Sequence, residues 1–277
     1  MKKSFYLLPF FLLLIFINGC SSFRNSPNQS QKTAKDSFYS VQIKTDTLFK
    51  SKQNINQLVL PNKSFKQYKI AIGNSQPKLV KTSEIAQTNN AVAAINGGFF
   101  DRDHGGSVTY FELNDSVISQ KRPDKIKWAV PDSLTNGVIL LAKNHKIIIE
   151  PARTSQFYEE SKKEAAVLVT GPLLIYHSKL QKLPKMEFTF KRHPRTCLCI
   201  TKESVIFVTI DGRSEQAAGM SLIETQKYLM NLGCYDAINL DGGGSTTMWI
   251  KNKGIVNFPS DKEGERLVSN AILLLEK

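Results

Sequence analysis

Short apolar runs, separated by polar and turn-forming residues, dominate the hydrophobic pattern of this chain. Some alternate with Lys, Asp and Thr, which is typical of a strand with one buried face. Others, such as 205–210, are continuous and rich in β-branched residues, which indicates strands buried on both faces. Residues 138–142 and 146–150 predict a hairpin with His145 in its turn. The predicted strands are 41–49, 68–72, 91–95, 108–113, 138–142, 146–150, 165–170, 197–201, 205–210, 237–240, 247–250 and 268–275.

The strongest helical pattern spans residues 221–232. Ser221 and Glu224 have the spacing of a capping box, and Gly233 is a typical helix stop. A second, short helix is predicted at 83–88. Because strands outnumber helices and do not alternate strictly with them, the pattern predicts an α+β fold. We expect a mixed, largely antiparallel sheet with few helices in a single catalytic domain.

The N-terminal residues have the pattern of a bacterial export signal. Two lysines precede the short apolar run 5–17, and a small residue then precedes Cys20. A run this short is typical of a signal peptide rather than of a membrane span. The small residue followed by Cys resembles a lipobox; an ordinary secretory signal that contains Cys is the alternative. The predicted organisation is a lipoprotein signal peptide at 1–19, a disordered tether at 20–36 and a folded domain at 37–277.

These segments predict where the protein is found. Lipid attached to Cys20 would anchor the mature chain to a membrane. No acidic cluster follows Cys20 that would favour export to the cell surface. We therefore expect a lipid-anchored protein of the bacterial cell envelope that faces the periplasm.

Charge and cysteine content narrow the choice of partners. The formal net charge is +13, spread along the chain without a dense basic run that contains aromatic residues. Nucleic acid is therefore not the expected partner, whereas anionic glycans or phosphates suit a basic surface. Besides Cys20 the chain has three cysteines, Cys197, Cys199 and Cys234. An odd number argues against a full disulfide framework. We expect them to be small core residues.

The most unusual stretch runs from Asn239 to Thr246, where a buried strand ends in Asp241 and three consecutive glycines. Glycine packs nothing, and a fold accepts it where the backbone turns sharply or approaches something closely. The simpler interpretation is a tight turn between two strands. The alternative is the wall of a site, with Asp241 beside bare backbone N–H groups that can face an anion.

Other strand ends favour a site. Asn96-Gly97-Gly98 and Asp101 follow one buried strand, and Asp211-Gly212-Arg213 follows another. Arg195 begins a further strand. Because functional side chains gather on the loops at strand ends, we expect these groups to meet in one cleft.

In their order and spacing these residues resemble the phosphodiester glycosidase family. The resemblance covers 91–275 and is densest from 195 to 250. The motifs that carry it are Asn96-Gly97-Gly98-Phe99, Arg195-Thr196, Asp211-Gly212-Arg213, Glu215-Gln216, Gly219 with Leu222 and Glu224, and Asn239 to Thr246. It implies hydrolysis of a sugar-1-phosphodiester between the anomeric carbon and its oxygen, on cell-envelope or exopolysaccharide glycans. The products would be a free sugar and a phosphomonoester.

The resemblance also implies roles for individual residues. We expect Asp241 to be the nucleophile or the base and Asp211 to be the second carboxylate. Glu224 is a further catalytic candidate, although it has an alternative role as the capping partner of Ser221. Arg195 is the expected phosphate clamp, because its fork binds two oxygens at once. Further substrate-binding candidates are Arg213, Asn96, Gly97, Gly98, Gly242, Gly243, Gly244, Ser245, Thr246 and Asn270; Asn270 can equally be a strand-edge side chain.

Two other functions remain open at this point. A metal-dependent phosphodiesterase that cleaves the P–O bond would use Asp101, Asp211 and Asp241 to hold a hard cation such as calcium. A lipoprotein that binds glycan without turnover is the other alternative. For the glycosidase itself no cofactor is expected, and a bound divalent cation such as calcium would be compatible with it.

Overall fold

The computed structural model describes Met1 and residues 39–277. The predicted signal peptide after Met1, the lipid site at Cys20, the whole tether at 20–36 and its boundary with the folded domain lie outside the described residues. The compact unit extends from Phe38 to Lys277. In the described part of the chain, no helix is both long and apolar enough to cross a membrane.

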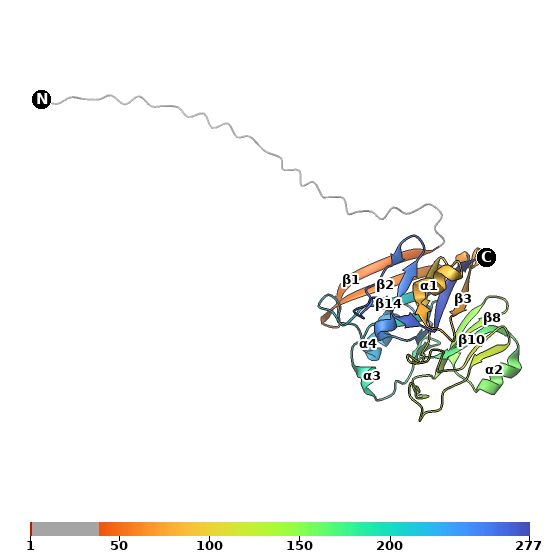
Figure 1. Ribbon diagram of the computed structural model, residues 1–277. Helices are drawn as coiled ribbons and strands as arrows, with labels where there is room; N and C mark the ends of the chain where they lie inside the picture. Colours follow the sequence, from red (N-terminus) through yellow and green to blue (C-terminus); the bar gives the residue numbers. More distant parts are fainter. Residues whose placement is uncertain (2–38) are drawn as a thin grey trace. The chain divides into compact units, whose positions relative to one another are not determined.

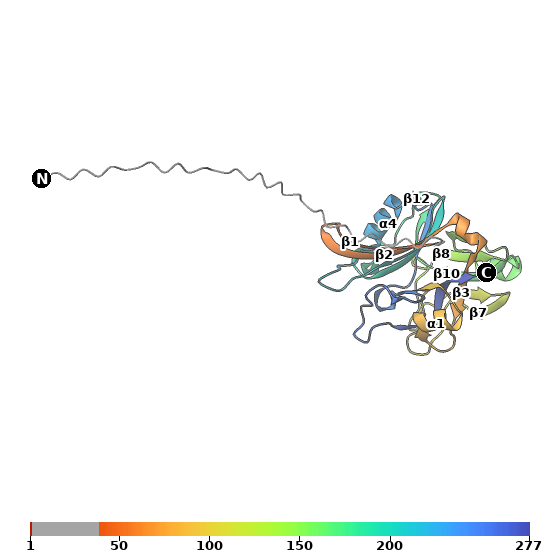
Figure 2. The same ribbon diagram turned by 90° about the horizontal axis from the view of Figure 1, so that it is seen from above.

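The largest sheet has seven strands in the order β1-β2-β14-β13-β15-β11-β12, and all its pairs are antiparallel. Strands far apart in the sequence lie side by side in it, and β1 and β2 form its outer hairpin (Figures 1 and 2). The bounds of these strands are β1 Ser40–Leu48, β2 Ser51–Pro61, β11 Leu173–Tyr176, β12 Lys179–Leu180, β13 Arg195–Ile200, β14 Ser204–Ile210 and β15 Asp236–Asn239.

Two five-stranded sheets complete the β structure, in the orders β7-β6-β10-β8-β9 and β17-β16-β5-β19-β3. Strands β18 (Leu267–Val268) and β4 (Val80–Lys81) form a separate pair. The remaining bounds are β3 Tyr68–Asn74, β5 Ala93–Asn96, β6 Phe111–Leu113, β7 Ser116–Ser119, β8 Gly137–Ala142, β9 Ile147–Pro151, β10 Glu164–Thr170, β16 Met248–Ile250, β17 Gly254–Ile255 and β19 Asn270–Glu276.

The main hydrophobic core joins all three large sheets. Its members are aliphatic and aromatic side chains that are almost completely buried, and removing them from water drives the sheets together. Representative members are Leu58, Ile95, Phe111, Ile139, Leu168, Phe207 and Ile272.

Within residues 39–277, four short α-helices accompany the sheets: α1 Thr82–Thr88, α2 Ser155–Ser161, α3 Glu187–Phe190 and α4 Leu222–Asn231. Two 3-10 turns lie at Asn62–Lys66 and Gly243–Ser245. Helix α4 begins with the predicted capping box and buries Leu222 and Leu229 against the seven-stranded sheet. The α+β fold with largely antiparallel sheets and few helices is confirmed, and every strand pair in the described residues is antiparallel.

Several elements differ from the predicted pattern, of which two are instructive. Strand β2 was not predicted, because Gln53, Asn54, Asn56 and Gln57 interrupt its apolar pattern, yet all four are buried. Three of these side chains donate a hydrogen bond inside the protein: Gln53 to the Gly219 carbonyl, Asn54 to Asp211 and Gln57 to Tyr228. The predicted strand 108–113 is shorter, since only its last three residues pair as β6.

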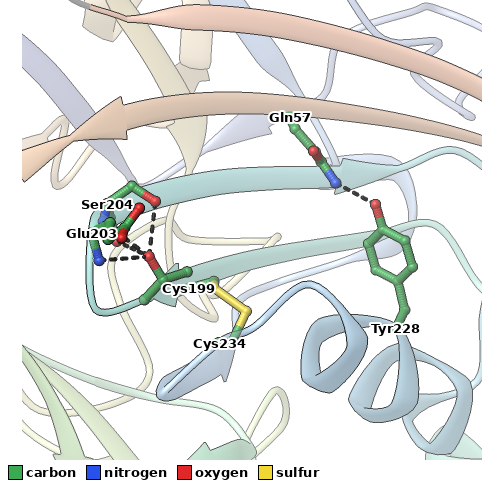
Figure 3. Close-up of a disulfide and its surroundings, with 7 residues drawn as sticks. Gln57, Cys199, Glu203, Ser204, Tyr228 and Cys234 are labelled. Atoms are coloured by element: carbon green, nitrogen blue, oxygen red, sulfur yellow. Dashed lines mark hydrogen bonds between the residues drawn. A yellow bond between two sulfur atoms is a disulfide. The ribbon is translucent and has the colours of Figure 1, made fainter.

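The prediction that the cysteines are simple core residues is wrong for two of them. Cys199 on β13 and Cys234 after α4 form a disulfide with a Cα–Cα distance of 5.6 Å (Figure 3). Helix α4 and the turn that follows bring Cys234 back onto the strand, which the spacing of 35 residues does not reveal. Cys197 is free and buried, as predicted for a core residue.

Candidate active site

The two glycine-rich strand ends meet at one point. The Asp241 N–H donates to the Gly97 carbonyl at 3.0 Å, and Asn96 Nδ2 donates to the Asp241 carbonyl at 2.7 Å. Asn96 Oδ1 accepts from Thr196 Oγ1 at 2.7 Å and from the Thr247 N–H at 3.2 Å. The Asn96 side chain is completely buried and fully used in these contacts. It therefore holds β5, β13 and the Asp241 loop together.

Asn270 braces the same corner from β19. Its carbonyl accepts from the Gly97 N–H at 2.9 Å, and its Oδ1 accepts from the Gly98 N–H at 2.8 Å. A Cβ atom at position 97 would lie 2.0 Å from Asn270 Oδ1. Gly97 is required by this close approach, and Asn270 is a buried support of the corner.

The carboxyl group of Asp241 lies in a small pocket, where two hydrogen bonds orient it. Ser245 Oγ donates to Oδ2 at 2.7 Å and the Gly242 N–H donates to Oδ1 at 3.0 Å. Burial raises the pKa of Asp241 to about 6, against the opposing effects of Ser245, Arg266 and Arg102. At neutral pH the group is therefore mainly ionised and held in one orientation.

This pocket, which we call the Asp241 pocket, has a volume of about 270 Å³. Phe99, Phe100 and Trp128 supply apolar walls, and Arg102 and Arg266 supply positive charge. An aromatic wall with two guanidinium groups beside a carboxylate suits a sugar ring that carries an anionic substituent.

The three glycines after Asp241 let the loop pass beneath charged side chains. A Cβ at Gly242 would lie 2.7 Å from the Pro194 carbonyl oxygen. A Cβ at Gly243, which has a φ of +61°, would lie 2.9 Å from Arg213 Nη2. A Cβ at Gly244 would lie 2.1 Å from Arg266 Nη2. The glycines thus form a ridge, Gly242–Gly244, with one guanidinium group over Gly243 and another over Gly244.

The two arginines of the Asp241 pocket differ in their partners. Arg266 donates to both oxygens of Asp261, at 2.7 and 2.9 Å. Within residues 39–277 Arg102 forms no ion pair, and its guanidinium lies 5.8 Å from the centre of the Trp128 ring. Arg102 is therefore the guanidinium in this pocket that is free to bind an anion.

Asp211 lines a different pocket, which we call the Arg213 pocket, of about 530 Å³. Its carboxylate accepts from Asn54 Nδ2 at 2.5 Å, Asn257 Nδ2 at 3.2 Å and the Phe258 N–H at 3.1 Å. Burial raises the pKa of Asp211 to about 6. The two pockets share no lining residue.

Asn257 connects Asp211 to the central loop. Its Nδ2 also donates to the Thr246 carbonyl at 3.0 Å, and its Oδ1 accepts from the Met248 N–H at 2.7 Å. Thr246 follows Ser245, the residue that orients Asp241. Asp211 is thereby linked to the Asp241 loop through one side chain.

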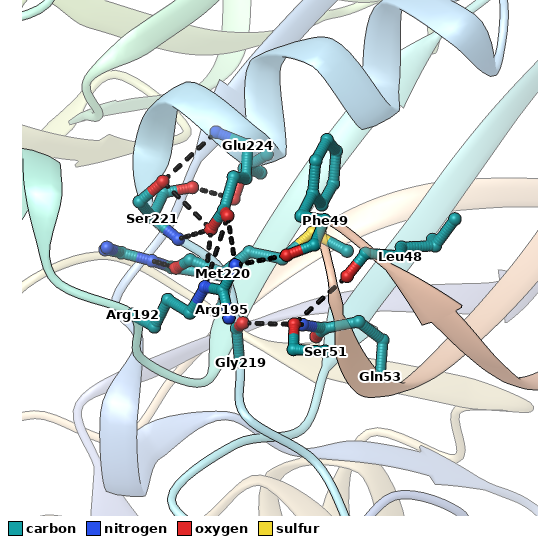
Figure 4. Close-up of polar contacts among 11 residues, drawn as sticks. Leu48, Phe49, Ser51, Gln53, Arg192, Arg195, Gly219, Met220, Ser221 and Glu224 are labelled. Atoms are coloured by element: carbon teal, nitrogen blue, oxygen red, sulfur yellow. Dashed lines mark hydrogen bonds and ion pairs between the residues drawn. The ribbon is translucent and has the colours of Figure 1, made fainter.

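The predicted phosphate clamp, Arg195, lies among protein carbonyl groups (Figure 4). Its Nε donates to Met220 O at 2.9 Å, and its Nη2 donates to Phe188 O at 2.9 Å and Lys191 O at 3.0 Å. The side chain is completely buried, and burial lowers its pKa to about 10. The structure does not place this guanidinium in the wall of either pocket.

Glu224 occupies its alternative role at the start of α4 (Figure 4). Its carboxylate accepts from the Ser221 N–H at 2.9 Å and from Arg192 Nε at 3.0 Å. The structure does not bring it to Asp241, because these partners hold it on the helix.

Asp101 is not grouped with Asp211 and Asp241. Although burial raises its pKa, the N–H groups of Asp103 and His104 and an ion pair with Arg122 at 2.6 Å bring it well below its usual range. In the described part of the chain, the group with close potential metal ligands is Asp101, Asp103 and His104. Asp211 and Asp241 do not belong to it, so the predicted three-carboxylate cation site is not assembled.

Sequence reasoning missed Arg102, Trp128, Asn257 and Arg266. They lie in loops that join or follow the strands, and no glycine motif adjoins Trp128, Asn257 or Arg266. Arg102 could have been found, since it directly follows Asn96–Asp101, the predicted second corner.

Comparison with known proteins identifies the family of this chain. The family model described as phosphodiester glycosidase matches residues 89–275, about two thirds of the chain. The chain belongs to the phosphodiester glycosidase family. Asn96, Arg102, Asp211, Asp241 and Arg266 all lie inside the matched region, and the family predicted from the sequence motifs is confirmed.

Two curated relatives of this phosphodiester glycosidase chain are mammalian. The N-acetylglucosamine-1-phosphodiester alpha-N-acetylglucosaminidase of Bos taurus is 26% identical over 175 residues, which cover 63% of this chain and 28% of the relative. The Homo sapiens protein of the same name is 28% identical over 166 residues, 60% of this chain and 27% of the relative. The aligned part of this chain thus spans little more than a quarter of those proteins.

Solved structures share the fold. The catalytic domain of the zebrafish N-acetylglucosamine-1-phosphodiester alpha-N-acetylglucosaminidase, described as auto-inhibited by its pro-peptide, has a TM-score of 0.67 and 18% identity, over 89% of this chain and 86% of that one. A hypothetical protein from Synechocystis has a TM-score of 0.63 and 15% identity, over 86% and 62% of the two chains. The single-domain α+β fold is therefore that of the family.

Proposed function

We propose that this protein hydrolyses a sugar-1-phosphodiester at the anomeric C–O bond. The observation that carries the proposal is the position of Asp241, a mainly ionised carboxylate in a pocket lined by Trp128 and two arginines. Membership of the phosphodiester glycosidase family and the names of the mammalian relatives support the same reaction class.

Asp241 attacks the anomeric carbon or removes a proton from the water that attacks it. In either case the C–O bond to the phosphate breaks, and its electron pair leaves with the phosphate oxygen. Oxygen from water ends on the sugar, and the phosphomonoester keeps the bridging oxygen. A phosphomonoester has a second pKa of about 6 and leaves readily near neutral pH, so the reaction needs little general-acid help.

The arginines of the Asp241 pocket hold the diester. Arg102 has no carboxylate partner in the described residues and is placed to bind the anionic phosphate oxygens. Arg266 is fixed by Asp261 and adds positive potential beside Asp241. The Trp128 ring offers an apolar face for the sugar.

For location we propose the bacterial cell envelope, with the chain anchored through lipid on Cys20 and its substrate on envelope or exopolysaccharide glycans. The Cys199–Cys234 disulfide supports an exported protein, since disulfides persist in oxidising compartments. The apolar run before Cys20 supports the anchor.

A panel of sugar-1-phosphate methyl esters that differ in the sugar tests the reaction. We expect free reducing sugar and methyl phosphate from at least one member with the native protein, and none above background with Asp241→Asn. Glycan binding without turnover of any member would instead support a non-catalytic lipoprotein.

A further inference from the structure

The Arg213 pocket has no part in the reaction described above. It is larger than the Asp241 pocket, and its lining includes Arg213, Gln216 and Ser260, which can donate hydrogen bonds. Phe258 flanks the same pocket with 74% of its surface exposed. The pocket therefore combines a cation, neutral donors and an apolar surface.

Arg213 is held in place although it forms no ion pair within residues 39–277. Its backbone has a φ of +63°, which non-glycine residues rarely adopt. Its Nη2 lies 3.4 Å from His193 Nδ1, and its Nη1 lies 3.5 Å from Ser260 Oγ. Burial and the neighbouring Arg195 and Arg213 lower the pKa of His193, so the neutral imidazole can accept from Arg213. A positioned guanidinium without a carboxylate partner is ready to bind an anion.

One arginine from the lining of each pocket lies against the glycine ridge. Arg213 stands over Gly243, whereas Arg266 and Asp261 stand over Gly244. Because Asp261 takes both hydrogen bonds of the Arg266 fork, the free guanidinium groups are Arg102 in one pocket and Arg213 in the other. The scissile phosphate occupies the first pocket, which leaves Arg213 for another group.

Asp211 lines the Arg213 pocket too, but its oxygens accept from Asn54, Asn257 and the Phe258 backbone. These donors offset the negative charge that an incoming anion would meet. The cation that faces an anion in this pocket is therefore Arg213.

We propose that the Arg213 pocket binds a second anionic group, phosphate or carboxylate, of the same glycan chain. This inference rests on the proposed hydrolysis at Asp241. It makes the preferred substrate a polyanionic glycan that carries another negative charge on the acceptor side of the scissile diester, with its neighbouring ring against Phe258.

The test compares three synthetic diesters with the same sugar-1-phosphate and different acceptor sugars: neutral, phosphorylated and carboxylated. We expect kcat/KM for at least one anionic acceptor to exceed that for the neutral one by about tenfold. The preference should decrease with added salt. Whichever anionic acceptor is preferred identifies the second group as phosphate or carboxylate.

Arg213→Gln should bring the ratio of anionic to neutral turnover close to one. Arg153→Gln is the matched control, because Arg153 is an exposed arginine outside both pockets, and it should keep the native ratio. Equal turnover of all three compounds by the native protein, or an unchanged ratio in Arg213→Gln, would refute the second site.

Calorimetry with Asp241→Asn gives the same comparison without turnover. If no compound is hydrolysed by the native protein, the proposed hydrolysis fails, yet tighter binding of an anionic acceptor that depends on Arg213 would still support the site. Equal binding of neutral and anionic compounds would overturn it.

Discussion

At the scale of single residues, substitution of Asp241 distinguishes a catalytic role of its carboxylate from a role in shaping the turn. Asp241→Asn keeps the shape of the side chain and removes its negative charge. We expect kcat to fall by roughly 10³-fold or more, because no other carboxylate lines the Asp241 pocket. The unfolding midpoint at pH 7 should stay equal or rise, since burial of the charge is costly. Asp115→Asn, at an exposed turn, is the control and should leave both unchanged. A parallel loss of stability and activity would assign Asp241 to the turn alone.

The raised pKa of Asp241 predicts opposite pH trends for activity and stability. Because the ionised form reacts, kcat/KM should rise with pH to a plateau above about 6. The carboxyl group binds its proton more tightly in the folded protein than in the unfolded chain, where the pKa of an aspartate is close to 3.8. The free energy of unfolding should therefore fall as pH rises from about 4 to about 6. Asp211 contributes in the same direction. Asp241→Asn should therefore flatten part of the stability profile, and a kcat/KM that is constant across this range would contradict the assignment.

We expect loss of Arg195 to reduce stability and loss of Arg102 to weaken substrate binding. Arg195→Gln removes donors from the Met220, Phe188 and Lys191 carbonyls and should lower the free energy of unfolding by roughly 3 kcal/mol. Arg102→Gln should raise KM about tenfold and change stability by less than about 0.5 kcal/mol. Urea unfolding and steady-state kinetics of both variants check this. A stable Arg195→Gln with raised KM would restore Arg195 as the phosphate ligand.

At the scale of elements, Asn257 joins the segment after β16 to Asp211 and to the central loop. Asn257→Ala leaves the Met248 N–H and the Thr246 carbonyl without this partner and should cost about 2 kcal/mol or more. Activity should also fall, because Ser245 next to Thr246 orients Asp241. Asn62→Ala, which loses one exposed bond to Lys202, should cost less than about 1 kcal/mol. Full activity in a destabilised Asn257→Ala would show that the loop does not depend on this link.

The same scale shows how far sequence reasoning reaches. Apolar runs and turn residues predict most strands, and the Ser221–Glu224 spacing predicts the start of α4. Strand β2 is not predicted in this way, because Asn and Gln side chains usually lie on the surface and those of β2 are buried. The Cys199–Cys234 disulfide cannot be predicted in this way, because the turn after α4 brings Cys234 next to Cys199.

At the scale of the whole molecule, the site depends on residues from far apart in the chain. The family match begins at residue 89, yet β2 lies before it and supplies Asn54 to Asp211. The motifs indicate which strand ends matter. They do not show which side chains turn inward, as Asn96 and Asn270 do, or which loops contribute arginines, as those with Arg102 and Arg266 do. Those outcomes depend on tertiary packing rather than on local pattern.

The position of bond cleavage tests the central claim most directly. The protein is incubated with a hydrolysable sugar-1-phosphodiester in water enriched in oxygen-18, and the phosphomonoester is examined by mass spectrometry. The phosphate is the diagnostic product, because the anomeric oxygen of a free sugar also exchanges with water. Cleavage at the anomeric C–O bond predicts a phosphomonoester without the heavy isotope. Incorporation of oxygen-18 into the phosphate would show P–O cleavage and contradict the role assigned to Asp241.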